Sequence, residues 1–151
     1  MHGMIKKKWG DQRGVAAIEF ALVLPILLIL VFGIIEFSTI LYDKAMITNA
    51  SREGARLGIV YRYDPETDSS GHPTTQDIID RVNIYLQNHL ISLGSPSNAA
   101  ETLVDKPNGD VSGQPLEVTV NYTYQFLVLP NFIATLTGGL NLSAVTIMRM
   151  E

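Results

Sequence analysis

The stretch Arg13-Gly14-Val15-Ala16-Ala17-Ile18-Glu19-Phe20, together with the apolar run that follows it to Ile35, decides the fold of this chain. Within the 21 residues from Val15 to Ile35, the only charged side chain is Glu19. A helix of this length spans about 30 Å, which is the thickness of a bilayer's hydrocarbon core. The basic residues before the run are Lys6, Lys7, Lys8 and Arg13. The stretch therefore predicts a transmembrane helix over residues 15–36 with a cytoplasmic N-terminus.

Gly14 and Glu19 distinguish this segment from a plain membrane anchor. A carboxylate inside an apolar helix costs about 2.5–3.5 kcal/mol at the helix centre and less near its end, and such residues usually serve a function. Cleavage after Gly14 would create an amine on Val15 as a partner for Glu19, and helix geometry favours the amine of a neighbouring subunit. The competing interpretation treats Gly14 as a chance glycine and Glu19 as an interfacial residue that snorkels or stays protonated.

The pattern continues with features that carry a family resemblance. A basic leader, a glycine, four small or apolar residues, Glu19, an aromatic residue and a long apolar helix resemble the class III signal of type IV pilins, in the short-leader form of the tight-adherence (Tad) pilus. The continuation Phe20-Ala21-Leu22-Val23-Leu24-Pro25 and the later Ala50-Ser51-Arg52-Glu53-Gly54-Ala55-Arg56 are similar to the TadE-like minor pilins. The resemblance covers about residues 1–60, and the C-terminal third agrees more loosely.

The resemblance implies a minor pilin or pseudopilin that assists the assembly of a Tad-type (type IVb) pilus used in adhesion or secretion. It implies a prepilin peptidase that cuts between Gly14 and Val15, and a role in assembly for Glu19 and Phe20. The implied partners are this peptidase, other Tad pilins, inner-membrane assembly proteins and the lipid bilayer. The implied location is the bacterial inner membrane, with one span, a cytoplasmic N-terminus, and a C-terminal domain that is periplasmic, extracellular or carried in the pilus.

Two other classes of protein fit the N-terminal segment. One is an unprocessed, single-pass anchor that carries a binding or sensor domain. The other is a secreted protein with a cleaved Sec-type signal, which has an apolar core of about 7–15 residues followed by a small-x-small cleavage site. The apolar run here is longer and no Ala-x-Ala follows it, which favours retention of the helix.

Composition bounds the remaining functions. The chain has 151 residues, a net charge of −4 and no cysteine, which removes disulfides, thiolate metal sites and cysteine nucleophiles. We expect a leader at 1–14, the membrane helix at 15–36 and an exported domain at 37–151. Outside the leader the basic residues form no patch with interleaved aromatics, which argues against nucleic acid as a partner.

No arrangement of residues predicts catalysis, a cofactor or a metal. The histidines, at positions 2, 72 and 89, form no His-x-x-x-His pair, and the sequence contains no nucleophile elbow or phosphate-binding loop. Asp64, Glu66 and Asp68 alternate as in a calcium loop, but Ser69 and Thr75 stand where an EF-hand needs glycine and glutamate. We therefore expect a solvated loop over residues 64–75 and no enzyme.

The helix is expected to continue beyond the membrane to about Val60. Pro25 should kink it near Ala21–Leu22, because proline lacks the N–H and crowds the carbonyl four residues earlier. Gly54, Ala55 and Gly58 should let the helix backbone lie close to a sheet. The charged side chains expected on the solvent side are Asp43, Lys44, Arg52, Glu53 and Arg56.

The rest of the exported domain reads as α+β. Thr74 and Asp77 form a capping box for an amphipathic helix over about residues 76–93, ended by Gly94. Residues 116–126 alternate apolar and polar as a half-buried strand does, with further strands at 103–104 and 140–150, a turn at 106–110 and a short helical or apolar turn at 132–136. The predicted fold is a long N-terminal membrane-spanning helix that extends into a small domain with one amphipathic helix and an antiparallel sheet of about three strands.

Overall fold

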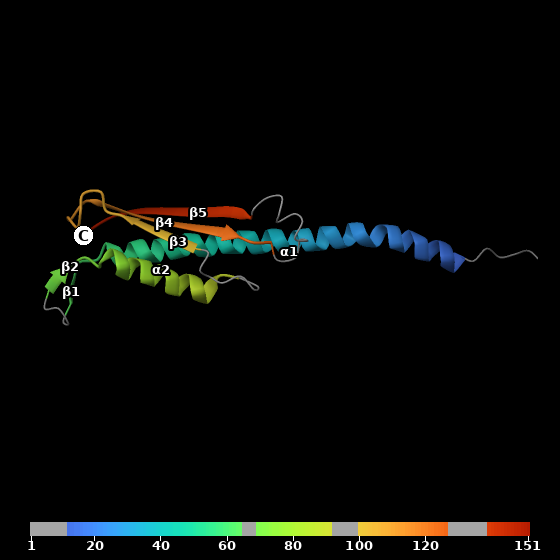
Figure 1. Cartoon of the computed structure of the whole chain (residues 1–151), viewed down its shortest axis with the longest axis horizontal. Coiled ribbons are helices and arrows are strands. Elements are labelled where there is room, and N and C mark those ends of the chain that lie inside the picture. Colours follow the sequence, from blue (N-terminus) through green and yellow to red (C-terminus); the bar gives the residue numbers. More distant parts are fainter. Residues whose placement is uncertain (1–11, 65–68, 92–99, 127–138) are drawn as a thin grey trace, which may run out of the picture. The chain divides into compact units, whose positions relative to one another are not determined.

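The computed structural model describes residues 12–64, 69–91, 100–126 and 139–151. Its elements follow in the order α1, β1, β2, α2, β3, β4 and β5 (Figure 1). The chain divides into two compact units, Met1–Ile35 and Glu36–Glu151, which are described separately. The predicted α+β fold, with a long N-terminal helix followed by a second helix and an antiparallel sheet, is confirmed.

Helix α1 spans Gln12–Gly58, and the helix continues through Pro25. In the first unit its side chains from residue 14 to residue 35 are exposed, apart from Leu24, which is partly covered. An 18-residue window has a mean hydropathy of 2.9, so the helix is long and apolar enough to cross a membrane. The part of α1 that belongs to the second unit ends at Gly58, two residues before the expected end.

The second unit is built around a three-stranded antiparallel sheet in the order β3-β4-β5. The strands are β3 at Ala100–Asp105, β4 at Pro115–Tyr124 and β5 at Leu140–Arg149. Strand β4 pairs along its whole length with β5, from Pro115 opposite Arg149 to Tyr124 opposite Leu140. Its side chains alternate between buried and partly exposed, as the period of two in the sequence predicts.

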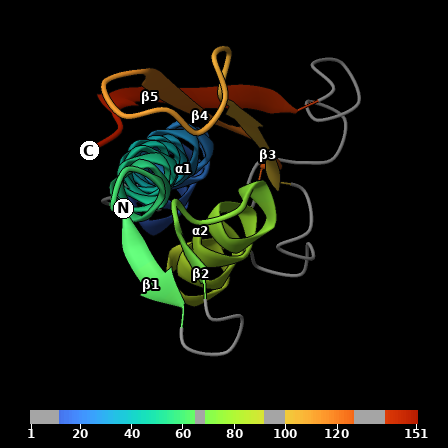
Figure 2. The same cartoon turned by 90° about the vertical axis from the view of Figure 1, so that its left-hand side faces the viewer.

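In the second unit, helices α1 and α2 pack against each other and against this sheet (Figure 2). The inner face of β4 supplies the largest share of the core, α1 and α2 supply most of the rest, and Ala144 of β5 and Met150 complete it. The buried apolar residues are Ile47, Ala50, Ala55, Ile78, Val82, Leu86, Leu116, Val118, Val120, Tyr122, Tyr124, Ala144 and Met150. A domain without cysteine is therefore stabilised by packing of this one core.

Helix α2 spans Thr75–His89 and begins with the predicted capping box. The Thr74 hydroxyl accepts a hydrogen bond from the Asp77 N–H, and the Asp77 carboxylate accepts one from the Thr74 N–H. The end at about residue 93 was predicted wrongly, because Leu90 is the C-cap and the next N–H, that of Ile91, donates to Asp43 instead of to the helix. Gly94 lies outside the described residues.

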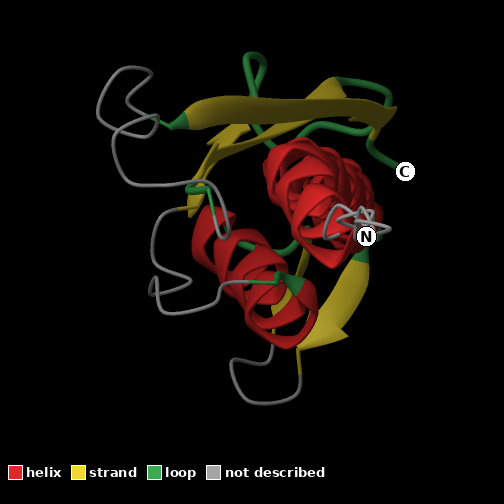
Figure 3. Cartoon of the chain, turned by 90° about the vertical axis from the view of Figure 1, so that its right-hand side faces the viewer, coloured by secondary structure: helices red, strands yellow, loops and turns green. Residues whose placement is uncertain are grey.

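The expected solvated loop at 64–75 contains secondary structure that the sequence did not predict. Strand β1, Arg62–Asp64, pairs antiparallel with β2, Ser69–Gly71, in a small separate sheet (Figure 3). Both strands have three residues, too few for an alternation of apolar and polar side chains to be visible. Residues 65–68, with part of the calcium-like pattern, and the apolar turn at 132–136 lie outside the described residues.

Candidate functional site

The residues predicted to act in processing and assembly lie near the start of α1. Gly14 is the third residue of the helix, and Val15, Glu19 and Phe20 follow with exposed side chains. Nothing lies within 4 Å of the position that a Cβ atom on Gly14 would take. Val15 and Glu19 are four residues apart, so they share one face of the helix. The structure thus places Val15 and Glu19 on one exposed face of α1, with Gly14 and Phe20 adjacent to them in the chain and also exposed.

The small residues of α1 that were expected to contact a sheet lie in the core of the second unit. Gly54, Ala55 and Gly58 are all buried. A Cβ atom on Gly54 would lie 2.5 Å from Val82 Cγ2 in α2, and one on Gly58 would lie 2.5 Å from Leu116 Cδ2 in β4. The absence of side chains therefore allows both α2 and the sheet to approach this turn of α1.

The first residue of the second unit, Glu36, has a buried carboxylate that the sequence did not predict. Glu36 is only 2% exposed, and its Oε1 accepts a hydrogen bond of 2.7 Å from the Tyr124 hydroxyl at the end of β4. Burial, and then the bond to Glu36, raise the pKa of Tyr124, so the phenol keeps its proton and remains the donor. This bond joins the first residue of the unit to the last residue of its central strand.

Asp43 is buried as well, which corrects its predicted place on the solvent side of α1. Its Oδ1 accepts a hydrogen bond of 3.1 Å from the Ile91 N–H, just beyond the end of α2, while its Oδ2 is buried without a hydrogen-bond partner. Burial raises the pKa of Asp43, and the bond from Ile91 opposes that rise. Leu41, an apolar residue two positions before Asp43 in α1, is by contrast exposed.

The helical spacing of residues along α1 could have predicted that both acids are buried. Glu36 and Asp43 are seven residues apart, which is two helical turns. Counting on from Asp43 in steps of four and three leads to Ile47 and Ala50, both fully buried. The two acids therefore lie on the same buried face of α1 as Ile47 and Ala50. In the sequence their charge suggested an exposed position instead.

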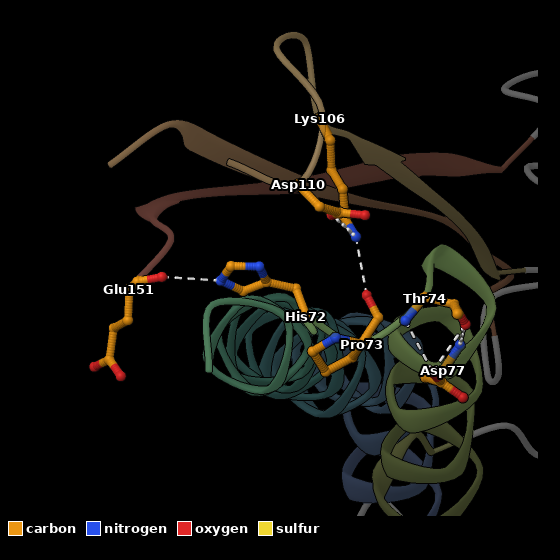
Figure 4. A network of polar contacts seen from close by, with 7 residues as sticks. All are labelled: His72, Pro73, Thr74, Asp77, Lys106, Asp110 and Glu151. Atoms are coloured by element: carbon orange, nitrogen blue, oxygen red, sulfur yellow. Dashed lines mark hydrogen bonds and ion pairs between the residues drawn. The ribbon is translucent and has the colours of Figure 1, made fainter. Parts of the chain in front are cut away.

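Polar contacts also join segments at the other end of the second unit, near the end of α1 at Gly58 (Figure 4). The Lys106 ammonium donates to the Pro73 carbonyl at 2.9 Å and pairs with Asp110 at 2.5 Å. His72 Nε2 lies 3.1 Å from the Glu151 carbonyl, and the Glu151 N–H donates to the Ile59 carbonyl at 3.0 Å. These contacts connect the loop before α2, the turn after β3 and the last residue to the end of α1.

The described residues offer little for ligand chemistry. They contain no group of three or more His, Asp or Glu side chains that could hold a metal ion. A depression of about 340 Å³ lies against the three-stranded sheet. It is lined by Glu101, Asn121, Tyr122, Thr123, Asn141, Leu142 and Ser143, which include no nucleophile paired with a base.

Comparison with known proteins identifies the N-terminal segment. The family model described as TadE-like protein matches residues 14–56, which begin at Gly14 and contain Glu19, Pro25 and both buried acids. No curated protein and no solved structure matches the chain significantly. The resemblance predicted from the glycine–glutamate pattern and from residues 50–56 is confirmed, because residues 14–56 are similar to the TadE-like family.

Proposed function

We propose that this protein is a minor pilin or pseudopilin that assists the assembly of a Tad-type pilus used in adhesion or secretion. The main support for this proposal is that the TadE-like match begins at Gly14 and runs along a helix that is apolar enough to span a membrane. The role is structural rather than enzymatic and needs no cofactor. The proposed location is the bacterial inner membrane, with a cytoplasmic N-terminus and a C-terminal domain that is periplasmic, extracellular or carried in the pilus.

The proposed processing step is cleavage between Gly14 and Val15 by a prepilin peptidase. Gly14 lies in the first turn of α1, where the N–H groups have no partner within the helix, so the backbone there opens at little cost. The open space around Gly14 gives a peptidase access to the bond. A peptidase that packs against a residue without a side chain would reject a larger residue at this position.

The proposed assembly step uses the product of that cleavage. The new amine on Val15 is positive, and Glu19 is the only acid between Val15 and Ile35. Pairing with the amine of a neighbouring Tad pilin would set the register between two helices, with Phe20 packing beside the pair. In an apolar setting such a pair acts mainly through the penalty for leaving one charge without its partner.

Mass spectrometry of the mature N-terminus tests this proposal. Protein extracted from membranes of cells that make the pilus should begin at Val15, and the Gly14→Val variant should retain the precursor's mass. An intact wild-type N-terminus would instead indicate an unprocessed anchor that carries a binding or sensor domain. A start beyond Ile35 would indicate a secreted protein, and processing of Gly14→Val at the wild-type rate would place the site elsewhere.

A further inference from the structure

Charged side chains are distributed unevenly along the second unit. One end of this unit, here called the proximal end, contains Glu36, Ile91, the end of β4 and the start of β5. The bond from Tyr124 to Glu36, the bond from Ile91 to Asp43 and the pairing of Tyr124 with Leu140 bring these segments together. Between Phe37 and Ser51 of α1, the only exposed charge is Lys44.

The other elements show the same asymmetry. No Asp, Glu, Lys or Arg follows Arg81 in α2. In β4 the single charged residue is Glu117, near the start of the strand. Strand β5 has only Arg149, at its far end. Glu101 in β3 is the exception. Because charged side chains normally cover a water-facing surface, their scarcity at the proximal end indicates an interface.

Apolar side chains occupy the proximal end in place of the charges. Phe37 and Leu41 of α1 are 62% and 54% exposed, and Tyr42, Ile91 and Leu140 are also exposed. Exposed apolar residues occur at the opposite end too, but there they are interleaved with charges, as in Tyr61-Arg62-Tyr63. Among the described residues, the proximal end presents exposed apolar side chains from α1, from Ile91 after α2 and from the start of β5, with little charge between them.

The position of these residues in the chain indicates what covers them. Phe37 follows the apolar run that ends at Ile35 by two residues, and about 20 residues of helix suffice to cross the hydrocarbon core. Residues 37–42 would then lie at the level of the lipid headgroups, where aromatic side chains are enriched. The two carboxylates nearest to this level, Glu36 and Asp43, are turned inward and buried.

We infer that the proximal end is a lipid-contacting surface, which lies at the boundary between acyl chains and headgroups through Phe37, Leu41, Tyr42, Ile91 and Leu140. The inference rests on the membrane-anchored function proposed above. Burial of Glu36 and Asp43 keeps two carboxylates, which an anionic membrane surface would repel, away from the surface of the proximal end. Lys44, whose ammonium donates to the Ser143 carbonyl, keeps a positive charge at the same level, which suits anionic headgroups.

Spin labels on single cysteines test the inference, because the chain has no cysteine of its own. The full chain is reconstituted in vesicles of phosphatidylethanolamine and phosphatidylglycerol. Labels are placed at Leu41→Cys, Ile91→Cys and Leu140→Cys, all exposed positions at which the substitution leaves the core intact. Ile147→Cys, on the outer face of β5 and 62% exposed, is the water-facing control, and Ile26→Cys, 68% exposed, is the control within the span.

Each spin label's collision rate is measured with oxygen, which is lipid-soluble, and with a water-soluble nickel complex. At the three proximal sites the collision rate with oxygen should exceed that with the nickel complex several-fold, and the label at position 147 should show the reverse. Nickel contact at the proximal sites, with Ile26 still in lipid, would overturn this inference and leave the membrane-anchored function standing. Nickel contact at Ile26 would overturn that function itself. Protection of the proximal sites from both reagents would mean that protein, such as a second copy of this chain, covers them, and would also overturn the inference.

Discussion

The Tyr124 hydroxyl donates a hydrogen bond of 2.7 Å to Glu36 Oε1, so the end of β4 is fastened to the residue at which the second unit begins. A hydrogen bond to a charged acceptor is stronger than one between neutral groups. The two residues are separated by 88 positions in the chain. The bond therefore holds together elements that nothing local in the sequence would join.

Replacing Tyr124 with phenylalanine should destabilise the second unit. The substitution keeps the ring in the core and removes only the hydroxyl, so the loss reports the hydrogen bond to Glu36. A bond to a charged group contributes about 1.5–3 kcal/mol, and we expect the free energy of unfolding to fall by that amount. Urea unfolding of the full chain in detergent, followed by protease resistance, measures the change.

Tyr122→Phe is the matched control for this experiment. Tyr122 is a buried tyrosine on the same face of the same strand, two residues earlier. No hydrogen bond to its hydroxyl is found among the described residues. Tyr122→Phe should therefore change stability much less than Tyr124→Phe. Equal losses from the two substitutions would mean that the bond to Glu36 contributes nothing of its own.

Asp43→Asn should alter how stability depends on pH. The folded-state pKa of Asp43 lies above 3.8, so the folded state is favoured by protonation and loses stability as pH rises from 3.8 through the folded-state pKa. Asparagine keeps an oxygen for the Ile91 N–H and carries no charge. At pH 7 the variant should equal or exceed the wild type, by up to about 1–3 kcal/mol, because it no longer buries a charge that a single hydrogen bond compensates.

The difference between the two proteins is the informative quantity, because all other groups titrate in both. Urea unfolding between pH 3 and 7 should show this difference shrinking toward acid. Asp43→Ala serves as the control, since it leaves the Ile91 N–H without its acceptor and should destabilise the domain throughout. An asparagine variant that is less stable than the wild type at pH 7 would show that the charge of Asp43 is needed.

Gly58→Leu should lower the amount of stable protein. A Cβ atom at this position already meets side chains of β4 and α2 at 2.5 and 2.6 Å, so the further atoms of leucine would overpack the core. Such overpacking costs typically about 1–3 kcal/mol. Gly33→Leu is the control, because nothing lies within 4 Å of a Cβ there. Equal abundance and protease resistance for the two variants would contradict the close packing at Gly58.

Glu19→Ala should separate insertion from assembly. Removing a carboxylate from the apolar helix eases insertion, so membrane levels should equal or exceed those of the wild type. Assembly should fail, because the Val15 amine would lack its partner, and breaking a buried pair costs about 3–5 kcal/mol. Glu19→Asp, one methylene shorter, should be intermediate. Membrane levels and surface pili are measured together in a strain without the native copy, and normal piliation with Glu19→Ala would remove the docking role.

The elements that the sequence predicted well are those whose signal is local. The apolar run to Ile35, the capping box of Thr74 and Asp77, and the alternation along residues 116–124 each depend on neighbours within one element. The helix end at Leu90 was missed because its cause is a carboxylate 48 positions away, on Asp43. Local periodicity cannot supply a contact of that kind.

The candidate site divides in the same way. Gly14, Val15 and Glu19 are recognisable because their spacing in one helix carries the pattern. Glu36 and Asp43 were not recognisable, because a carboxylate in a helix is expected at the surface unless a partner is known. Their partners, Tyr124 and the N–H of Ile91, come from other elements, so only the tertiary structure brings them together.

The bond from the Glu151 N–H to the Ile59 carbonyl, with Met150 buried beside it, has a consequence for how the protein is made. Strand β5 is synthesised last, yet it completes the sheet that covers α1, and α1 is synthesised first. Contacts between such distant segments close slowly. The second unit therefore cannot finish folding until β5, which follows the other described elements in the chain, has joined the sheet, and until then the apolar face of β4 is exposed to chaperones and proteases.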